Sequence, residues 1–188
     1  MGGFIFAFTV KRCYNFSNMH KNNTKVRVGV IGAGVLGSVH ARLYSELKNT
    51  VLFGVCDINK ERLKNISDTL RCATFENYRK LFGLVDAVSI AVPTSLHFKI
   101  AKELLLNNIN ILVEKPITID PSEADELLEL AQKKGLILQV GHVERFNAAV
   151  KVVRRFTKNP RFIECHRLGP FVKRVKDIGV VLDLMIHD

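Results

Sequence analysis

Three glycines at fixed spacing form the first group of residues that could do chemistry. Gly32, Gly34 and Gly37 follow the apolar run 26–31 and precede a segment with helical periodicity. In a turn from a strand to a helix, the first glycine permits a tight bend, the second lets backbone N–H groups approach an anion, and the third allows close packing of the helix. The helix N-terminus adds free N–H donors and a partial positive charge. The pattern predicts a diphosphate site that includes Val35 and Leu36.

An acidic residue follows at the distance that a dinucleotide site requires. Asp57 stands 20 residues beyond Gly37, at the end of the apolar run 51–57. A carboxylate there can accept hydrogen bonds from the hydroxyls of an adenosine ribose, and it repels a 2′-phosphate. NAD is therefore the expected cofactor, in preference to NADP. The alternative is that Asp57 only caps a helix beginning near Asn59.

Strands and helices alternate along the chain, as a parallel sheet requires. Apolar runs predict strands at 26–31, 51–57, 85–93, 110–116 and 136–142. Helical spacing of larger side chains lies between them, at Leu36, His40, Leu43 and Leu47 and again at Leu96, Ile100 and Leu104. This alternation predicts an α/β fold with a doubly wound parallel sheet of the Rossmann type.

The clearest predicted helix begins at the sequence DPSE. Asp120 can act as the N-cap, Pro121 suits the first turn, and Glu123 holds the position of a capping box. Gly135 ends this helix. Its buried stripe is predicted to consist of Ala124, Leu127, Leu128 and Ala131.

Three clusters of unusual residues fall where predicted strands end. They are PTSLH at 93–97, EKP at 114–116 and GHVERFN at 141–147. Ligands of open parallel sheets bind outside the carboxyl ends of the strands. A single polar loop could occur without any function, but three at one edge predict a site. The candidate cofactor contacts among them are Pro93, Thr94, His97, Glu114 and Lys115.

A carboxylate and an imidazole stand four residues apart near the end of the chain. On a helix, Asp183 and His187 would share one face. The carboxylate would orient the imidazole and raise its basicity, which suits a general base for an alcohol proton. The alternative is a surface ion pair at an exposed helix start.

The motifs VGVIGAGVLGSVH, AVPTSLH, VEKPI, VGHVERFN and DLMIHD together resemble those of the Gfo/Idh/MocA family, over residues 25–188. The resemblance implies an oxidoreductase that uses NAD or NADP to oxidise or reduce a hydroxyl of a sugar or cyclitol. It implies that Lys115 contacts substrate and nicotinamide, and that His187 is the acid/base beside Asp183. It also implies a cis peptide bond before Pro116.

Parts of the sequence are similar to one branch of that family, the UDP-N-acetylglucosamine 3-dehydrogenases. The similar segments are GHVERFN, ECHRLGPF and VVLDLMIHD. Ala148 departs from this branch, in which a proline commonly follows ERFN. The resemblance implies a sugar or nucleotide-sugar substrate, and the basic stretch after Lys151 would suit its diphosphate.

Three regions are expected from this resemblance and from the charge distribution. Residues 1–24 are expected to be a disordered or mis-assigned extension, 25–145 a dinucleotide-binding domain, and 146–188 the truncated start of an α+β substrate domain. Of the net charge of +10, nine basic groups against Glu164 alone lie in 151–176. An alternative function is therefore a non-catalytic NAD-binding module whose basic tail contacts nucleic acid or a partner chain. Since neither a helix-turn-helix nor an aromatic-rich RNA motif is visible, nucleic acid is not the expected partner.

The remaining expectations concern metals, compartment and assembly. The four cysteines include no C-x-x-C pair, so no metal site is predicted. Cys56 lies in an apolar run, which favours a buried, reduced thiol in the cytoplasm. The apolar N-terminal run is shorter than the roughly 20 residues that cross a bilayer. An exposed GVVLDLMI segment would favour a homo-oligomer or a complementing C-terminal chain.

Overall fold

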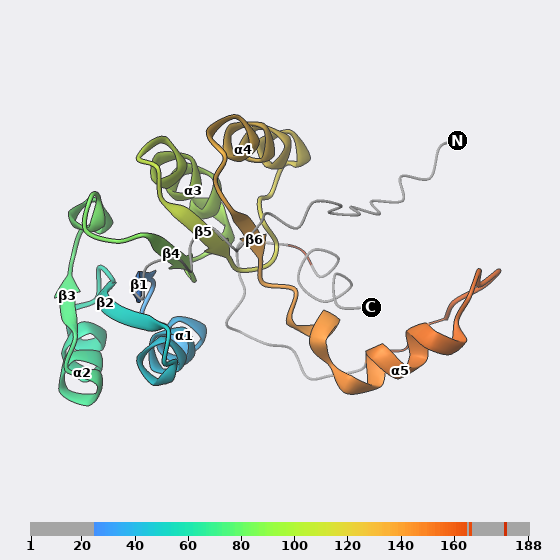
Figure 1. The fold of residues 1–188 in the computed structure, drawn as a ribbon, viewed down its shortest axis with the longest axis horizontal. Coiled ribbons are helices and arrows are strands. Elements are labelled where there is room, and N and C mark those ends of the chain that lie inside the picture. The colour runs from blue at the N-terminus through green and yellow to red at the C-terminus, as the bar shows by residue number, and fades with distance from the viewer. Residues whose placement is uncertain (1–24, 165, 167–178, 180–188) are drawn as a thin grey trace.

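The structure, a computed structural model, describes residues 25–164, 166 and 179 of the chain. Its centre is a six-stranded sheet with the strand order β3-β2-β1-β4-β5-β6, and every neighbouring pair is parallel. The strands are β1 Val26–Ile31, β2 Thr50–Cys56, β3 Ala73–Phe75, β4 Ala87–Ile90, β5 Asn110–Val113 and β6 Leu138–Val140. The predicted doubly wound α/β fold is confirmed, and the direction of winding changes between β1 and β4 (Figure 1).

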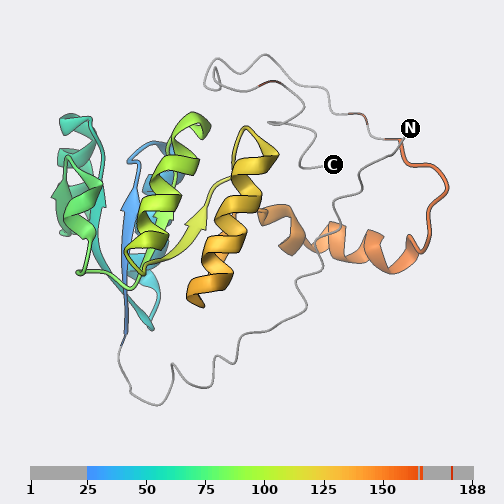
Figure 2. The ribbon, with the colours of Figure 1, turned by 90° about the horizontal axis from the view of Figure 1, so that it is seen from above.

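Helices cover both faces of this sheet. They are α1 Val35–Glu46, α2 Lys60–Leu70, α3 His97–Leu106 and α4 Pro121–Lys134, and α5 Ala148–Phe156 follows beyond the sheet. Helices α1 and α2 lie on one face, and α3 and α4 lie on the other (Figures 1 and 2). Short 3-10 turns precede or join these elements at Tyr78–Leu81, Thr94–Leu96 and Val143–Phe146.

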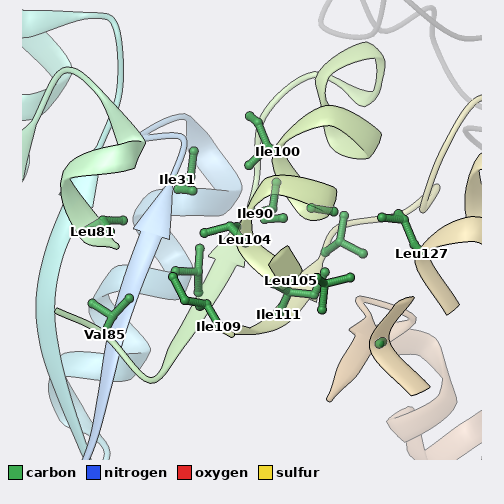
Figure 3. Packing of buried hydrophobic residues seen from close by; sticks show 14 of the residues in the cluster. Ile31, Leu81, Val85, Ile90, Ile100, Leu104, Leu105, Ile109, Ile111 and Leu127 are labelled. Carbon is green, nitrogen blue, oxygen red and sulfur yellow. The ribbon is translucent and has the colours of Figure 1, made fainter. Parts of the chain in front are cut away.

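The larger core lies between α3, α4 and the sheet. Leu104, Leu105, Ile111 and Leu127 are buried there against one another and against Ile90 (Figure 3). Burial of each such side chain contributes roughly 1.5–3 kcal/mol. A smaller cluster on the opposite face joins Val30 and Val55 to α1 and α2. Because the central strands are buried on both sides, they read as continuous apolar runs in the sequence.

Helix α4 begins and ends where the sequence predicts. Asp120 is its N-cap, and Gly135 ends it with a positive φ of 68°. The cap itself differs in detail, since Oδ1 of Asp120 accepts hydrogen bonds from the nitrogen and hydroxyl of Ser122, both at 2.8 Å. The Asp120 side chain therefore binds Ser122 rather than Glu123, the residue of the expected capping box.

Helix α1 is present as the helical spacing predicts, and the leucines that showed this spacing lie outside its buried face. Leu36 is 42% exposed and Leu43 is 44% exposed, while Gly37 and Ala41 are buried. The reason is the closeness of the helix to the preceding turn, where a Cβ at position 37 would lie 1.7 Å from the carbonyl oxygen of Gly32. Only small side chains fit on that face, so the leucines point outward.

Some elements differ from the expected bounds or lie outside the described part of the chain. Strands β4, β5 and β6 are shorter than the apolar runs that predicted them, and the edge strand β3 was not predicted. Residues 1–24 and the pair Asp183 and His187 lie outside the described residues. Among the described helices, none has the length and apolar character needed to cross a bilayer.

Candidate functional site

The turn between β1 and α1 is closely packed at two of its three glycines. Gly32 has a φ of 99°, and a Cβ there would lie 2.3 Å from the carbonyl oxygen of Ala91. Its N–H donates to the carbonyl of Cys56 at 2.7 Å, which ties the turn to β2. Gly37 is equally restricted by the carbonyl of Gly32. These two glycines therefore hold the turn and the helix against the sheet.

The remaining glycine, Gly34, faces open space. A Cβ added at Gly34 would meet no atom within 4 Å. Gly34 is the N-cap of α1 and supplies no side-chain hydrogen bond, and the first turn of the helix carries no acidic residue. Val35 is 68% exposed beside it. The backbone N–H groups at this helix start are thus accessible to an anion approaching from outside the sheet.

Asp57 faces the same turn from the end of β2. Its Oδ2 accepts a hydrogen bond from the nitrogen of Ala33 at 2.6 Å, and its Oδ1 accepts one from the nitrogen of Asn59 at 2.8 Å. The side chain is only 8% exposed, and Nη1 of Arg62 lies 3.9 Å away. Helix α2 is capped by Asn59, whose side chain accepts from the nitrogen of Arg62. The carboxylate of Asp57 therefore lies beside Ala33 and the open space at Gly34, a region that we name the mouth of the turn. It is not the N-cap of α2.

The loop after β4 contributes one exposed and two buried candidates. Pro93 is exposed, whereas Thr94 is 7% and His97 is 1% exposed. Nδ1 of His97 lies 2.8 Å from the carbonyl oxygen of Pro116, and Nε2 lies 2.9 Å from that of Val92. His97 therefore links the loop after β4 to the loop after β5.

The EKP segment follows β5 and contains the predicted cis peptide bond, between Lys115 and Pro116. Glu114 is buried, with Oε1 3.1 Å from Nε2 of His40 and Oε2 accepting from the nitrogen of Lys115 at 3.3 Å. Burial acts to raise the pKa of Glu114, but the hydrogen bond from His40 and the interactions with Lys115 together outweigh it, so the pKa lies below its ordinary value. The side chain of Glu114 is thus turned toward α1.

The structure brings most of the predicted cofactor residues to one edge of the sheet. The glycine turn and Asp57 lie at the ends of β1 and β2, and Pro93 and Lys115 follow β4 and β5 at the same edge. The catalytic pair Asp183 and His187 lies outside the described residues, so its place at this edge stays a prediction. No cluster of potential metal ligands occurs among the described residues.

Two polar residues near this edge were missed as site residues. The sequence indicates His40 only as part of a helix, and it gives Ser89 only as one residue of the apolar run 85–93. Nδ1 of His40 is 2.6 Å from Oγ of Ser89, which is fully buried. A hydroxyl in a strand that is otherwise apolar on both faces was the available signal, because a buried polar group requires a partner.

Comparisons with known proteins agree with this geometry. The sequence profile of the Gfo/Idh/MocA oxidoreductase family, described as an NAD-binding Rossmann fold, matches residues 26–142. UDP-N-acetylglucosamine 3-dehydrogenase from Acidithiobacillus ferrooxidans is 43% identical over 164 residues, which make up 87% of this chain and 52% of that protein. Its solved structure gives a TM-score of 0.79, with 87% of this chain and 54% of that chain covered.

Two further similarities are more distant. Glucose-6-phosphate 3-dehydrogenase from Bacillus subtilis is 29% identical over 86% of this chain and 41% of that protein. The structure of GenD2 from gentamicin A biosynthesis in complex with NAD is 25% identical, with a TM-score of 0.61, over 63% of this chain and 35% of that chain. The chain spans about half the length, or less, of the curated relatives it matches.

Proposed function

The chain belongs to the Gfo/Idh/MocA family of NAD-binding oxidoreductases, and we propose on that premise that it binds NAD and serves in hydride transfer to or from a sugar hydroxyl. The observation that carries the proposal is the mouth of the glycine turn. There the carboxylate of Asp57 is held 2.6 Å from the nitrogen of Ala33, and the space beside Gly34 is open. This arrangement suits a diphosphate next to an adenosine ribose.

NAD is proposed in preference to NADP because of Asp57. Each carboxylate oxygen of Asp57 accepts one backbone hydrogen bond and has a further lone pair available for a ribose hydroxyl. A 2′-phosphate in that position would be repelled by the carboxylate and would lose the hydroxyl donor. Arg62, whose Nη1 lies 3.9 Å from Asp57, offsets only part of this repulsion, since its side chain is 55% exposed and its charge is screened by solvent.

The proposed catalytic residues are Lys115, which lies among the described residues, and Asp183 and His187, which lie outside them. Bound NAD would supply the hydride acceptor. The ammonium of Lys115 would donate a hydrogen bond to the substrate hydroxyl, and His187 would take the proton of that hydroxyl. Asp183 would orient the imidazole of His187. We further propose a sugar or nucleotide sugar, such as a UDP-N-acetyl sugar, as the substrate class.

Cofactor binding is tested by titrating the purified chain with NADH and following NADH fluorescence, then repeating with NADPH. We expect saturable NADH binding that is at least about tenfold tighter than NADPH binding, which corresponds to about 1.4 kcal/mol. Asp57→Ala should weaken NADH binding, while Glu46→Gln, at an exposed position of α1, should leave it unchanged. Fluorescence that does not saturate in the unmutated chain would contradict the proposal.

Turnover is tested separately, by following NAD reduction with UDP-N-acetylglucosamine and, in parallel, with inositol. Activity that His187→Ala removes and His20→Ala preserves would support the assigned base.

Saturable NADH binding without turnover would instead favour the alternative, a non-catalytic NAD-binding module. In that case, steeply salt-dependent binding of DNA or RNA would point to the basic side chains of α5, which include the exposed Lys151, Arg154 and Arg155.

Two further proposals concern the compartment and the assembly. The free thiol of Cys56 is buried, which suits a reducing compartment such as the cytoplasm.

Three apolar side chains of α5, those of Val152, Val153 and Phe156, are at least 50% exposed. A second copy or a complementing chain would cover such apolar side chains, and the oligomeric state in solution, measured by light scattering, tests this.

A further inference from the structure

Two histidines flank Lys115 through its neighbours in the chain, His40 partly buried and His97 buried. His40 on α1 contacts the side chain of Glu114, the residue before Lys115, at 3.1 Å. His97 at the start of α3 contacts the carbonyl oxygen of Pro116, the residue after Lys115, at 2.8 Å. The two helices lie on opposite faces of the sheet (Figures 1 and 2). The segment that carries Lys115 is therefore fixed from both faces.

On one face, His40 connects the glycine-turn helix to two strands. Nδ1 lies 2.6 Å from Oγ of Ser89 in β4, and Nε2 faces Oε1 of Glu114 after β5. The side chains of His40 and Glu114 are 14% and 10% exposed. The carboxylate also lies close to Gly141 after β6, where a Cβ would be 3.0 Å from Oε1. An ionised carboxylate only accepts hydrogen bonds, so Nε2 of His40 is the donor.

On the other face, His97 connects the loops after β4 and β5. Its two ring nitrogens face the carbonyl oxygens of Pro116 and Val92, and its side chain is almost completely buried. A carbonyl oxygen only accepts hydrogen bonds, so a ring nitrogen of His97 that carries a proton can donate to the carbonyl it faces. Neither His97 nor His40 is exposed enough to meet a substrate at the open edge.

We propose that His40 and His97 are positioning residues that set the location of Lys115 relative to the glycine turn. The inference rests on the proposed function, in which Lys115 contacts the nicotinamide. A lysine side chain has four rotatable bonds, so its ammonium is placed accurately only when the backbone that carries it is fixed. His40 is central to this, because α1 begins at the glycine turn and also holds Glu114. One helix thereby connects the proposed diphosphate site with the proposed nicotinamide contact.

Paired amide variants separate this role from a general role in folding. The amide of asparagine can replace the Nδ1 contact of a histidine, and the longer glutamine can replace the Nε2 contact. His40→Gln therefore keeps the bond to Glu114, whereas His40→Asn keeps only the contact to Ser89. By the same geometry, His97→Asn keeps the bond to Pro116, whereas His97→Gln keeps only the bond to Val92.

The readout is the ratio of the dissociation constants of NADH and ADP-ribose, both measured by calorimetry on the full chain. ADP-ribose carries the adenosine and the diphosphate but no nicotinamide. His40→Asn and His97→Gln should weaken NADH binding about fivefold or more relative to ADP-ribose, as expected for one misplaced or lost hydrogen bond. His40→Gln and His97→Asn should leave the ratio within about twofold of that of the unmutated chain.

The control variant is Glu103→Gln on α3. Glu103 is also a partly buried carboxylate that accepts hydrogen bonds, from Arg79 and Tyr78, but it is not part of the EKP segment. We expect it to leave the NADH to ADP-ribose ratio unchanged. If His40→Asn fails to fold in a thermal melt, Glu114→Gln tests the same contact, because it removes the charge that His40 contacts while keeping the side-chain shape. If His97→Gln fails to fold, the comparison of His40→Asn with His40→Gln decides the inference.

Three outcomes would overturn the inference, and only the last of them also rejects the proposed function. Equal weakening of NADH and ADP-ribose binding in His40→Asn and His97→Gln, or no weakening of either, would reject the positioning role while the proposed function stands. If the unmutated chain binds neither ligand, the proposed function fails and this inference fails with it.

Discussion

Oδ2 of Asp57 lies 2.6 Å from the backbone nitrogen of Ala33, so a carboxylate at the end of β2 is bound directly to the turn that follows β1. The contact fixes the distance between the two parts of the proposed site, the N–H groups near Gly34 and the carboxylate oxygens. The side chain of Asp57 is only 8% exposed, so solvent screens its electrostatic interaction with a neighbouring group only weakly.

The first prediction concerns the choice between NAD and NADP. Asp57→Ser removes the charge that would repel a 2′-phosphate and leaves Arg62 nearby as a cation. We expect the affinity for NADPH relative to NADH to rise about tenfold or more, because opposite charges near a protein surface attract by roughly 1–4 kcal/mol. Parallel fluorescence titrations with the two cofactors measure the ratio. In the double variant Asp57→Ser, Arg62→Ala, the gain for NADPH should largely disappear, and a gain that persists would show that Arg62 has no part in it.

The second prediction separates two glycines of one turn. Gly37→Ala places a Cβ 1.7 Å from a carbonyl oxygen, so we expect the free energy of unfolding to fall by about 3 kcal/mol or more. Gly34→Ala places its Cβ in open space at an ordinary φ of −72°, so stability should change by less than about 0.5 kcal/mol. The added methyl group would lie at the mouth, where a diphosphate must approach closely.

Both variants are compared by chemical denaturation and by NADH titration. Gly34→Ala is expected to keep its stability and to lose affinity for NADH, about tenfold or more. Unchanged NADH affinity in a stable Gly34→Ala chain would contradict a diphosphate beside Gly34, whatever Gly37→Ala does. The pair therefore distinguishes a glycine needed for packing from a glycine needed for ligand approach.

Features set by neighbouring residues could be predicted from the sequence. The spacing of Gly32, Gly34 and Gly37 placed the turn, and Asp120 with Gly135 placed the two ends of α4, because turns and caps depend on backbone conformation within a few residues. The doubly wound parallel sheet followed from the alternation of elements together with the rules of connection handedness. The expected position of Asp57 at the mouth of the turn followed from the same local pattern.

Features set by packing between distant residues could not be predicted in this way. The contact of His40 with Glu114 exists only because α1 lies over the ends of β4 and β5, and neither residue has a sequence neighbour that indicates the other. The buried face of α1 could not be derived from its leucines for the same reason, since the approach of the helix to Gly32 decides which side chains fit inward. His97 was expected at the cofactor, and the carbonyls that surround it come from two separate loops.

The third prediction concerns acid stability through Asp86 and Arg27. Asp86 accepts hydrogen bonds from the backbone nitrogen and guanidinium of Arg27, at 2.8 Å from the nitrogen and from Nη2. These bonds hold the pKa of Asp86 below its ordinary value, although burial acts in the opposite direction. A carboxyl with a lowered pKa stabilises the folded chain above its ordinary pKa of about 3.9, and that stability is lost as the pH falls through the lowered value.

Asp86→Asn should therefore lower the free energy of unfolding by about 0.5–1 kcal/mol at pH 7, a small value because the pair is partly exposed and screened. The difference from the unmutated chain should shrink as the pH is lowered from about 4 toward 2, and urea denaturation at several pH values measures it. Asp68→Asn, an exposed position on α2, is the control and should show no such convergence. A difference independent of pH would mean that packing, and not charge, is responsible.

The fourth prediction concerns the thiol of Cys56, which ends β2 directly before Asp57. Burial and the neighbouring charge of Asp57 raise its pKa to about 12. Because the thiolate is the reactive form, the thiolate fraction at pH 8 should be roughly 2000-fold below that of an ordinary cysteine with a pKa near 8.5. Alkylation of the native chain with iodoacetamide at pH 8, followed by peptide mass analysis, should leave Cys56 unlabelled until denaturant is added.

Cys72 serves as the comparison within the same chain, because it is less buried and should be alkylated sooner. Rapid native labelling of Cys56 would mean that the end of β2 opens readily, and an opening there would also release Asp57 from the glycine turn.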